Sequence, residues 1–275
     1  MANVRLTRRV GFSSGHRYWL EAESEARNAE LFGRWASRFN HGHNYFLEVT
    51  AIGPVDESTG MVVNIKDIDA VLQELVVERF DQKSINDEVP EFAGLVPSTE
   101  NLLRFFVAQL SELPGEVELI ELKLEETPTL HGNWKKDNDK VTITRSYEFA
   151  ASHRLYIPEM SEERNLELYG KCCNEHGHGH NYILEVEVSG EPDSITGFVT
   201  DLTQLDEAVE ELVVDRYDHK NLNIQVEELA GKVPTSEVVA LAIFSKLDGS
   251  IPGVLESVRL HETARNIFEV KRNDL

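Results

Sequence analysis

The feature that most constrains this chain is a repeated stretch, HGHNY, which occurs at His41–Tyr45 and again at His178–Tyr182. The two stretches are 137 residues apart, and the same interval relates many identical residues elsewhere in the two halves. Chance does not hold one interval over so many positions, so the chain consists of two copies of one domain. The other matched pairs are Phe12 and Phe149, His16 and His153, Gly60 and Gly197, Asp81 and Asp218, Lys83 and Lys220, Pro97 and Pro234, and Glu100 and Glu237.

The boundary between the copies is expected in the polar, turn-prone run 135–140, which looks like a short linker and gives domains of residues 1–137 and 138–275. Alternating apolar residues predict strands, and apolar residues at helical spacing behind Asn64 and Asp201 predict a helix in each copy. A second helix is expected after Pro97 and Pro234. The order strand, strand, helix, helix, strand, strand predicts an α+β fold, with an antiparallel four-stranded sheet and two helices on one face in each copy.

Composition restricts the partners. With 41% hydrophobic residues the 275-residue chain can form sizeable cores, and its formal charge of −22 argues against nucleic acid or an anionic membrane as a partner. The two cysteines, Cys172 and Cys173, are adjacent, so no disulfide is expected and a reducing compartment is favoured. No apolar leader or membrane-length run is visible, and the prediction is a cytoplasmic protein.

The histidines of the repeated stretch indicate metal binding. His178 and His180 are two positions apart on a predicted strand, so both imidazoles point to one face. One such pair is weak support, but this one occurs in both copies, and a third histidine lies at the end of the preceding strand of each. Three histidines with an open fourth position are typical of a catalytic zinc site. The predicted zinc ligands are His153, His178 and His180 in the second copy and His16, His41 and His43 in the first.

The combined motifs of the second copy resemble those of the 6-pyruvoyltetrahydropterin synthase family, which includes the 6-carboxytetrahydropterin synthases of queuosine biosynthesis. They are F-x-A-x-H at 149–153, a cysteine ahead of HGHNY, DHKNL at 218–222, PTSE at 234–237 and ET at 262–263. The resemblance covers both halves nearly end to end. It implies two tunnelling-fold (T-fold) domains, in which sheets from several subunits join into a barrel and active sites lie between subunits.

The resemblance also implies roles. Cys172 matches the catalytic cysteine, and Asp218 and His219 match the pair that completes the triad from a neighbouring subunit. The implied reaction converts 7,8-dihydroneopterin triphosphate, a small pterin substrate, to 6-pyruvoyltetrahydropterin, with Zn²⁺ as cofactor and Mg²⁺ expected with the triphosphate. A thiolate is a competent base once a histidine and a metal lower its pKa. The implied substrate-binding residues are Thr235, Ser236 and Glu237 at a helix start and Glu262, which anchors the pterin ring.

The first copy departs from this pattern at two positions. Trp35 stands where the second copy has Cys172, and Gln82 replaces the histidine that follows the aspartate. The first copy nevertheless keeps its three histidines and Glu126, the counterpart of Glu262. It is expected to hold zinc as a structural half, or to bind pterin without turnover, while the second copy carries the chemistry.

Other products and another class of function stay open. Glu175 lies three positions before His178, where some family members carry a glutamate and release a 6-hydroxymethylpterin for folate, and this makes Glu175 a further catalytic candidate. The queuosine-type members usually have cysteine four positions before that histidine, where this chain has Asn174. A non-catalytic pterin-binding module is the alternative from another class.

The resemblance implies a triad whose residues come from two subunits, so the chain is expected to form a homo-oligomer. The expected assembly is a trimer of tandem chains or a multiple of it. In a ring of alternating copies Cys172 would face Asp81 and Gln82, and glutamine cannot relay a proton as histidine does. Rings made of one kind of copy are therefore predicted.

Overall fold

The computed structural model describes residues 2–275, which form two compact units. Unit 1 contains the chain up to Thr144 together with Ser189–Thr200, and unit 2 contains Arg145–Val188 and Asp201–Leu275. The units therefore follow the two sequence copies closely, except that residues 138–144 and Ser189–Thr200 of the second copy belong to unit 1.

The sheet of unit 1 has four long antiparallel strands, as predicted. β1 (Asn3–His16) pairs with β2 (His41–Pro54), β2 with β4 (Glu118–Thr127), and β4 with β5 (Leu130–Lys135). The short β3 (Lys83–Ser84) adds to β1 in parallel orientation. Sequence periodicity cannot reveal β3, because two residues are too few to show an alternation.

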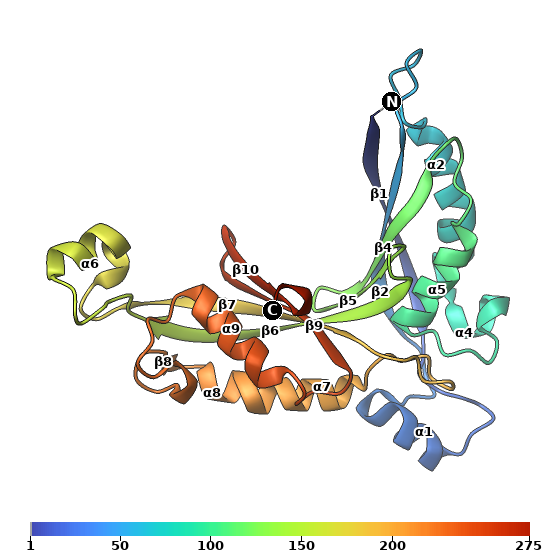
Figure 1. Cartoon of the computed structure of the whole chain (residues 1–275). Helices are drawn as coiled ribbons and strands as arrows, with labels where there is room; N and C mark the ends of the chain where they lie inside the picture. The colour runs from blue at the N-terminus through green and yellow to red at the C-terminus, as the bar shows by residue number, and fades with distance from the viewer. Residues whose placement is uncertain (1) are drawn as a thin grey trace. The chain divides into compact units, whose positions relative to one another are not determined.

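Two helical segments cover one face of this sheet (Figure 1), which confirms the predicted layer order. The first is α2 (Ile65–Leu72), which continues through a π-helical turn into α3 (Glu78–Phe80), and the second is α5 (Thr99–Gln109). Asn64 and Ser98 start α2 and α5 by accepting a backbone N–H bond in their side chains. The remaining short elements of this copy are α4 (Ile85–Glu88) and 3₁₀ turns at Gly33–Trp35 and Pro90–Phe92.

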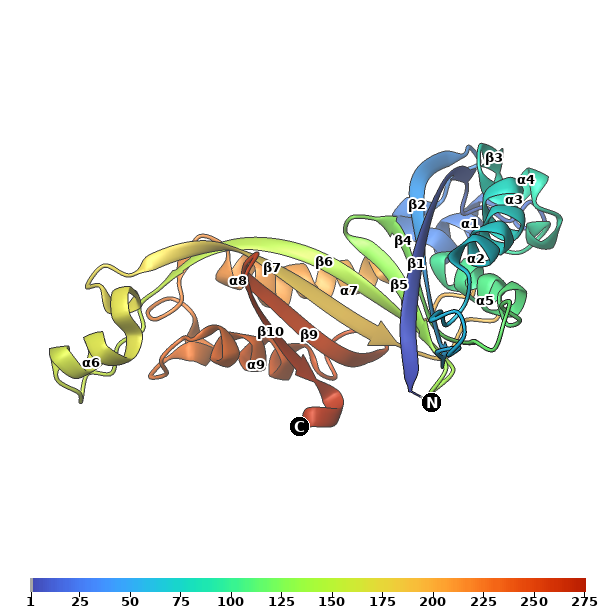
Figure 2. The same cartoon turned by 90° about the horizontal axis from the view of Figure 1, so that it is seen from above.

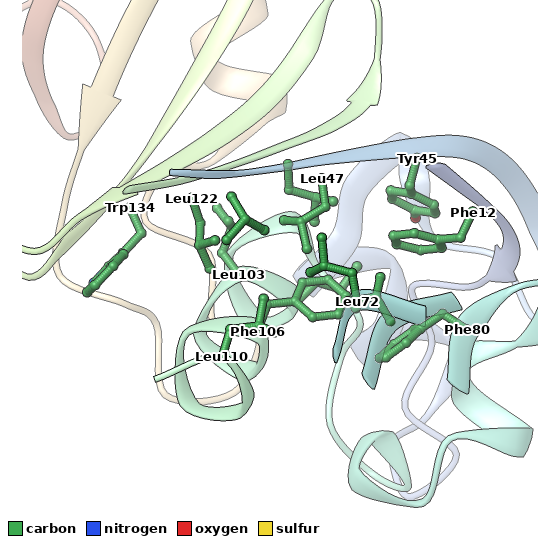
Figure 3. Packing of buried hydrophobic residues seen from close by; sticks show 14 of the residues in the cluster. Phe12, Tyr45, Leu47, Leu72, Phe80, Leu103, Phe106, Leu110, Leu122 and Trp134 are labelled. Carbon is green, nitrogen blue, oxygen red and sulfur yellow. The ribbon is translucent and has the colours of Figure 1, made fainter. Parts of the chain in front are cut away.

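The core of unit 1 lies between the sheet and these helices (Figure 3). Phe12 of β1 stacks on Tyr45 of β2, with ring centroids 5.0 Å apart, and Phe106 of α5 contacts the edge of Phe12 at 6.0 Å. Leu47 and Leu72 are fully buried in the same cluster. Burial of such a side chain contributes about 1.5–3 kcal/mol, so this cluster holds the helices on the sheet. It also fixes the strand ends that carry the histidines.

Unit 2 has the same arrangement of a sheet with helices on one face, and the order of its long strands is β10-β9-β7-β6. Its strands are β6 (Lys140–His153), β7 (His178–Ser189), β9 (Val254–Thr263) and β10 (Asn266–Lys271), with the short β8 (Lys220–Asn221) parallel to β6. The helices α7 (Leu202–Val209) and α9 (Ser236–Leu247) lie on one face of these strands (Figure 2). A π-helical turn joins α7 to α8 (Asp215–Tyr217), and 3₁₀ turns lie at Gly170–Cys173, Glu227–Leu229 and Arg272–Asp274.

Two features differ from the sequence prediction. A further helix precedes each HGHNY stretch, α1 (Glu25–Phe32) and α6 (Glu162–Tyr169), and both are too polar to show an apolar face in the sequence. The run 135–140 is a tight turn between β5 and β6 rather than a linker, since the Asp139 amide donates to the Lys135 carbonyl at 3.0 Å. No helix in residues 2–275 is long and apolar enough to cross a membrane.

Candidate active site

Three histidines of unit 2 converge where β6 ends and β7 begins. His153 is the last residue of β6, His178 is the first of β7, and His180 follows on the same face. Their ligand atoms all lie within 4.8 Å of one another. Gly177 permits this approach, because a Cβ there would lie 2.5 Å from the His153 carbonyl oxygen and its φ is +67°. The structure therefore brings the predicted metal ligands together.

The protonation of these histidines suits a metal ion. Nδ1 of His153 lies 2.8 Å from the Pro234 carbonyl oxygen and donates to it, so Nε2 carries the lone pair that faces the other two rings. Burial, followed by the proximity of His178 and His180, lowers the pKa of His153, and burial also lowers the pKa of His180. Nε2 of His180 is buried and has no hydrogen-bond partner within residues 2–275. Neutral imidazoles with inward-facing, unsatisfied nitrogens fit a bound metal ion.

A carboxylate lies beside the histidines. Oε1 of Glu262, near the end of β9, is 3.8 Å from Nε2 of His153 and 3.9 Å from Nε2 of His180. Ser236 donates to this carboxylate at 2.7 Å and Asn266 at 3.0 Å. Burial raises the pKa of Glu262, but the bonds from Asn266 and Ser236 and the nearby histidines outweigh it, and the pKa is lowered overall. Glu262 is therefore an ionised acceptor at neutral pH.

Asp218 and His219 form a hydrogen-bonded pair just after α8. Nδ1 of His219 is 2.6 Å from Oδ2 of Asp218, and the Ala150 amide donates to Oδ1 at 2.7 Å. The bond from Ala150, followed by the bond from His219, lowers the pKa of Asp218. His219 has a left-handed backbone, with φ +56°, and its side chain is 83% exposed. The aspartate thus orients the imidazole and leaves Nε2 free to exchange a proton.

One pocket of about 710 Å³ in unit 2 joins these groups. His180, His219 and Glu262 all line it, and Lys220 supplies a cationic side chain beside them. Sequence reasoning gave no role to three polar residues of the wall, although two of them lie inside the recognised motifs HGHNY and DHKNL. These residues are Asn181, Asn221 and Gln225.

The other two predicted catalytic residues, Cys172 and Glu175, do not line this pocket. Cys172 lies on the 3₁₀ turn after α6, is partly buried, and accepts a backbone bond from Leu155 at 2.9 Å. Glu175 is exposed, and neither residue is among those that line the pocket. Unit 2 alone therefore does not bring Cys172 to His219.

Of the three residues at the start of α9, Thr235–Glu237, only Ser236 contacts a residue that lines the pocket. Thr235 caps α9 and Ser236 holds Glu262, as described above. Glu237 is exposed in the first turn of α9 and does not line the pocket.

Unit 1 contains the same histidine arrangement. In the β1–β2 register His16 is opposite His41 and Ser14 is opposite His43, and the three histidines have ligand atoms within 4.8 Å of one another. Nδ1 of His16 lies 3.0 Å from the Pro97 carbonyl oxygen, and burial followed by the proximity of His41 lowers the pKa of His16 to about 4. As in unit 2, a carboxylate lies beside the rings, since Oε1 of Glu126 is 3.4 Å from Nε2 of His43.

Unit 1 has different residues at the positions of Cys172 and His219. Its equivalent pocket is about 360 Å³, and Gln82, with φ +58°, occupies the position that His219 has in unit 2. Trp35, at the position of Cys172, packs against the buried cluster of Tyr18, Phe32 and Val96. Unit 1 thus retains the metal-type residues, while an aromatic side chain in a packed cluster replaces the thiol.

Comparison with known proteins identifies the family. A family profile described as 6-pyruvoyl tetrahydropterin synthase matches residues 5–135 and again residues 142–273. The chain belongs to this family, as a tandem duplication of its domain, and the predicted α+β T-fold is confirmed.

Individual relatives cover about half of the chain. 6-Pyruvoyl tetrahydrobiopterin synthase of Homo sapiens is 45% identical over 130 residues, which are 47% of this chain and 90% of the relative. The Drosophila melanogaster protein of the same name is 44% identical over 131 residues, 47% of this chain and 78% of the relative. A putative 6-carboxy-5,6,7,8-tetrahydropterin synthase of Archaeoglobus fulgidus is 46% identical over 95 residues, 34% of this chain and 76% of the relative. The solved 6-pyruvoyl tetrahydropterin synthase of Caenorhabditis elegans is 42% identical, with a TM-score of 0.45 over 47% of this chain and 94% of that one.

Proposed function

We propose that the second copy is a zinc-dependent lyase that converts 7,8-dihydroneopterin triphosphate to 6-pyruvoyltetrahydropterin with loss of triphosphate. The observation that carries this proposal is the single pocket on which His180, His219 and Glu262 meet. In this proposal His180 is a metal ligand, His219 transfers a proton and Glu262 accepts the pterin ring, and all three line this pocket. The names of the relatives, 6-pyruvoyl tetrahydrobiopterin synthases at about 45% identity, support the same substrate class.

Substrate binding uses opposite charges at two points of the pocket. The ionised Glu262 accepts two N–H bonds from the pyrimidine edge of the pterin, a charge-assisted and directional contact. Lys220 is the cation on the same wall and receives the triphosphate, with Mg²⁺ as its expected counter-ion. A local cation is needed because the chain as a whole carries a formal charge of −22.

The chemistry is a proton transfer followed by departure of triphosphate. A base removes the proton from the side-chain carbon next to the ring, and His219, oriented by Asp218, accepts or returns protons at Nε2. Cys172, supplied by a neighbouring subunit, is the proposed base in its thiolate form. A zinc ion held by His153, His178 and His180 would supply Lewis-acid stabilisation to the side-chain oxygens. The free thiols also suit a reducing cytoplasm.

Two other reactions within the family are the alternatives. Folate-type cleavage would use Glu175, which like Cys172 does not line the pocket of its own unit, so this reaction is the second candidate that product analysis has to separate. The 6-carboxy reaction would use a cysteine at the position that Asn174 holds. The non-catalytic alternative describes the first copy, where Gln82 and Trp35 replace both proton-transfer residues.

Product analysis tests the proposal. The zinc-loaded chain is incubated with 7,8-dihydroneopterin triphosphate, and pterins are identified by mass spectrometry. We expect 6-pyruvoyltetrahydropterin with stoichiometric triphosphate, and no product from His219→Gln, which imitates the first copy. A 6-hydroxymethyl or 6-carboxy pterin as the main product would contradict the proposal, and so would full activity of His219→Gln.

A further inference from the structure

The carboxylate beside the histidines of unit 1 lies close to metal-ligand spacing. Oε1 of Glu126 is 3.4 Å from Nε2 of His43 and 3.8 Å from Nε2 of His16. Two ligand atoms of one tetrahedral zinc ion lie about 3.3 Å apart, because each is about 2.0–2.1 Å from the metal. Nε2 of both histidines is buried and has no hydrogen-bond partner within residues 2–275. One metal ion can therefore bind the carboxylate oxygen and both nitrogens after a small shift.

The hydrogen bonds to the two equivalent carboxylates differ between the copies. Thr99 donates to Oε2 of Glu126, so the oxygen that it holds is not the one nearest the histidines. In unit 2, Ser236 donates at 2.7 Å to Oε1 of Glu262, which is the oxygen nearest the histidines. Asn266 donates to the other oxygen at 3.0 Å. Side chains of its own copy thus hold both oxygens of Glu262, whereas Oε1 of Glu126 is directed at the metal-type nitrogens.

Glu126 is also more buried than its counterpart. Its side chain is 5% exposed, against 15% for Glu262. Glu262 lines the pocket of unit 2, but the pocket of unit 1 reaches His43 and, among residues 2–275, does not include Glu126 in its wall. Burial of an ionised carboxylate is costly unless the group is paired or coordinates a metal. A divalent ion at the three histidines would compensate the charge of Glu126.

Larger or more apolar side chains stand at two positions around the first-copy site. Leu130, which is 6% exposed, occupies the position at which unit 2 has the asparagine that holds its carboxylate. Tyr18 is 4% exposed and lies edge-on to His16, with ring centroids 5.1 Å apart, and its counterpart in unit 2 is the partly buried Leu155. Phe198 packs on Tyr18 in turn, with ring centroids 5.5 Å apart. Apolar packing therefore encloses the first-copy histidines and carboxylate together.

We propose that Glu126 is the fourth metal ligand of the first copy, beside its three histidines, and that this copy is a closed, structural zinc site. Structural zinc sites have four protein ligands, whereas a catalytic zinc site keeps one position open. In the second copy Ser236 binds the equivalent oxygen of Glu262, so the fourth position stays open for substrate oxygens. The same residue type thus closes one site and serves the pocket of the other.

The four ligands come from three neighbouring strands. His16 ends β1, His41 and His43 begin β2, and Glu126 is the last residue but one of β4. A metal ion held by all of them joins the three strands at one end of the sheet. Because the free energy of metal binding adds to the free energy of folding, the role of this ion is to stabilise unit 1.

The inference requires that the histidines bind metal, but it does not depend on the reaction proposed above. Its tests measure coordination and metal release, so they give a result whether or not the second copy forms 6-pyruvoyltetrahydropterin. Failure of the one proposal is therefore distinguishable from failure of the other.

The test uses full-length chains in which only one site can bind metal. His178→Ala with His180→Ala leaves the first-copy site, and His41→Ala with His43→Ala leaves the second-copy site. Each chain is loaded with Co²⁺, whose visible absorption spectrum reports its coordination, and azide is then added. Azide binds a metal that has an open position, so the spectrum of the second-copy site should shift and that of the first-copy site should not.

Zinc release to a coloured chelator tests the fourth ligand itself. We expect Glu126→Gln to speed release from the first-copy site about 10–100-fold, at least the usual effect of removing a group that supports a metal site. Glutamine keeps the shape of the side chain and an acceptor for Thr99. Glu262→Gln is the matched control and should change release from the second-copy site far less, since Ser236 and Asn266 hold this carboxylate.

Three results would overturn the inference. They are an azide-induced shift at the first-copy site, zinc release that Glu126→Gln leaves unchanged, and a first-copy site that binds no Co²⁺. Circular dichroism of each metal-loaded variant shows whether it is folded. The azide comparison keeps the native Glu126, so a folding defect of Glu126→Gln does not affect it.

Discussion

Nδ1 of His153 lies 2.8 Å from the carbonyl oxygen of Pro234, immediately before the Thr235 that caps α9. The first copy repeats this relationship between His16 and Pro97, at 3.0 Å. In both copies a loop carbonyl thus fixes the tautomer of the deepest histidine and turns Nε2 toward the other two rings. The start of the helix and the metal-type site are therefore one structural unit.

The first prediction is that each chain binds two zinc ions, because both copies keep a complete histidine triplet. Elemental analysis of a chain purified without chelators should approach two zinc ions per chain. His41→Ala with His43→Ala should remove one ion and leave product formation in the second copy. A chain with one ion that this double substitution does not remove would show that the first copy binds none.

The second prediction separates the two adjacent cysteines. Cys172→Ala should lower kcat at least about 100-fold, the usual contribution of a positioned base. Cys173→Ala is the matched control and should keep most of the activity, because its thiol donates to the Gly170 carbonyl oxygen at 3.1 Å within its own turn. Steady-state kinetics of both variants measure this. Equal activity of the two would move the base role to another residue, with Glu175→Gln as the next variant.

The third prediction concerns the triphosphate. Lys220 lines the larger pocket, and Lys83 is its counterpart in the first copy. Lys220→Ala should raise KM about tenfold with a smaller change in kcat, as loss of one charge-assisted contact requires. Lys83→Ala should leave both constants unchanged. A fall in kcat alone for Lys220→Ala would instead indicate a role in the chemical step.

The fourth prediction is a pH dependence of stability at Glu100. Burial raises the pKa of Glu100 from 4.5 to about 7, so between these values the folded chain binds a proton that the unfolded chain has released. Its contribution to stability is full below pH 4.5 and is lost as the pH rises through about 7. Relative to Glu100→Gln, wild type should therefore lose about 3 kcal/mol of unfolding free energy between about pH 4 and pH 8.

Denaturant unfolding at both pH values measures this difference. Glu112→Gln, at an exposed position, should shift stability equally at the two pH values. A wild-type to Glu100→Gln difference that does not change with pH would show that Glu100 is hydrated rather than buried.

The sequence was sufficient to predict the duplication, the antiparallel sheet and both histidine triplets. Spacing explains this, because alternation on a strand puts His178 and His180 on one face wherever the strand lies. The role of Glu262 came only from the family resemblance, and its position beside His153 was not predicted, since no local pattern joins β9 to the end of β6.

Three features could not be predicted for physical reasons. The helices α1 and α6 are too polar to show an apolar face, and their defining contact is a buried side chain such as Asn165, which holds the backbone of Ile157. The docking of Phe198 in unit 1 depends on tertiary contacts across 180 residues, from Tyr18 onward. The polar wall residue Gln225 carries no motif at all.

The last prediction tests whether the active site is shared between chains. In unit 2 the thiol of Cys172 and the imidazole of His219 are not on the same pocket wall, because Cys172 lies on the turn after α6. If both act in one reaction, they come from different chains. Cys172→Ala and His219→Ala chains should each be inactive, and mixing them under conditions of subunit exchange should restore activity, since some sites then pair an intact Cys172 with an intact His219. With random pairing, about a quarter of the wild-type activity is expected, as each residue is intact in half of the chains.

The control is a mixture of Cys172→Ala chains with Cys172→Ala, His219→Ala double-variant chains, which contains no intact cysteine and should stay inactive. Recovery is measured as pterin product after exchange is verified by mass spectrometry of isotope-labelled chains. No recovery despite verified exchange would place both residues in one chain and contradict the shared site.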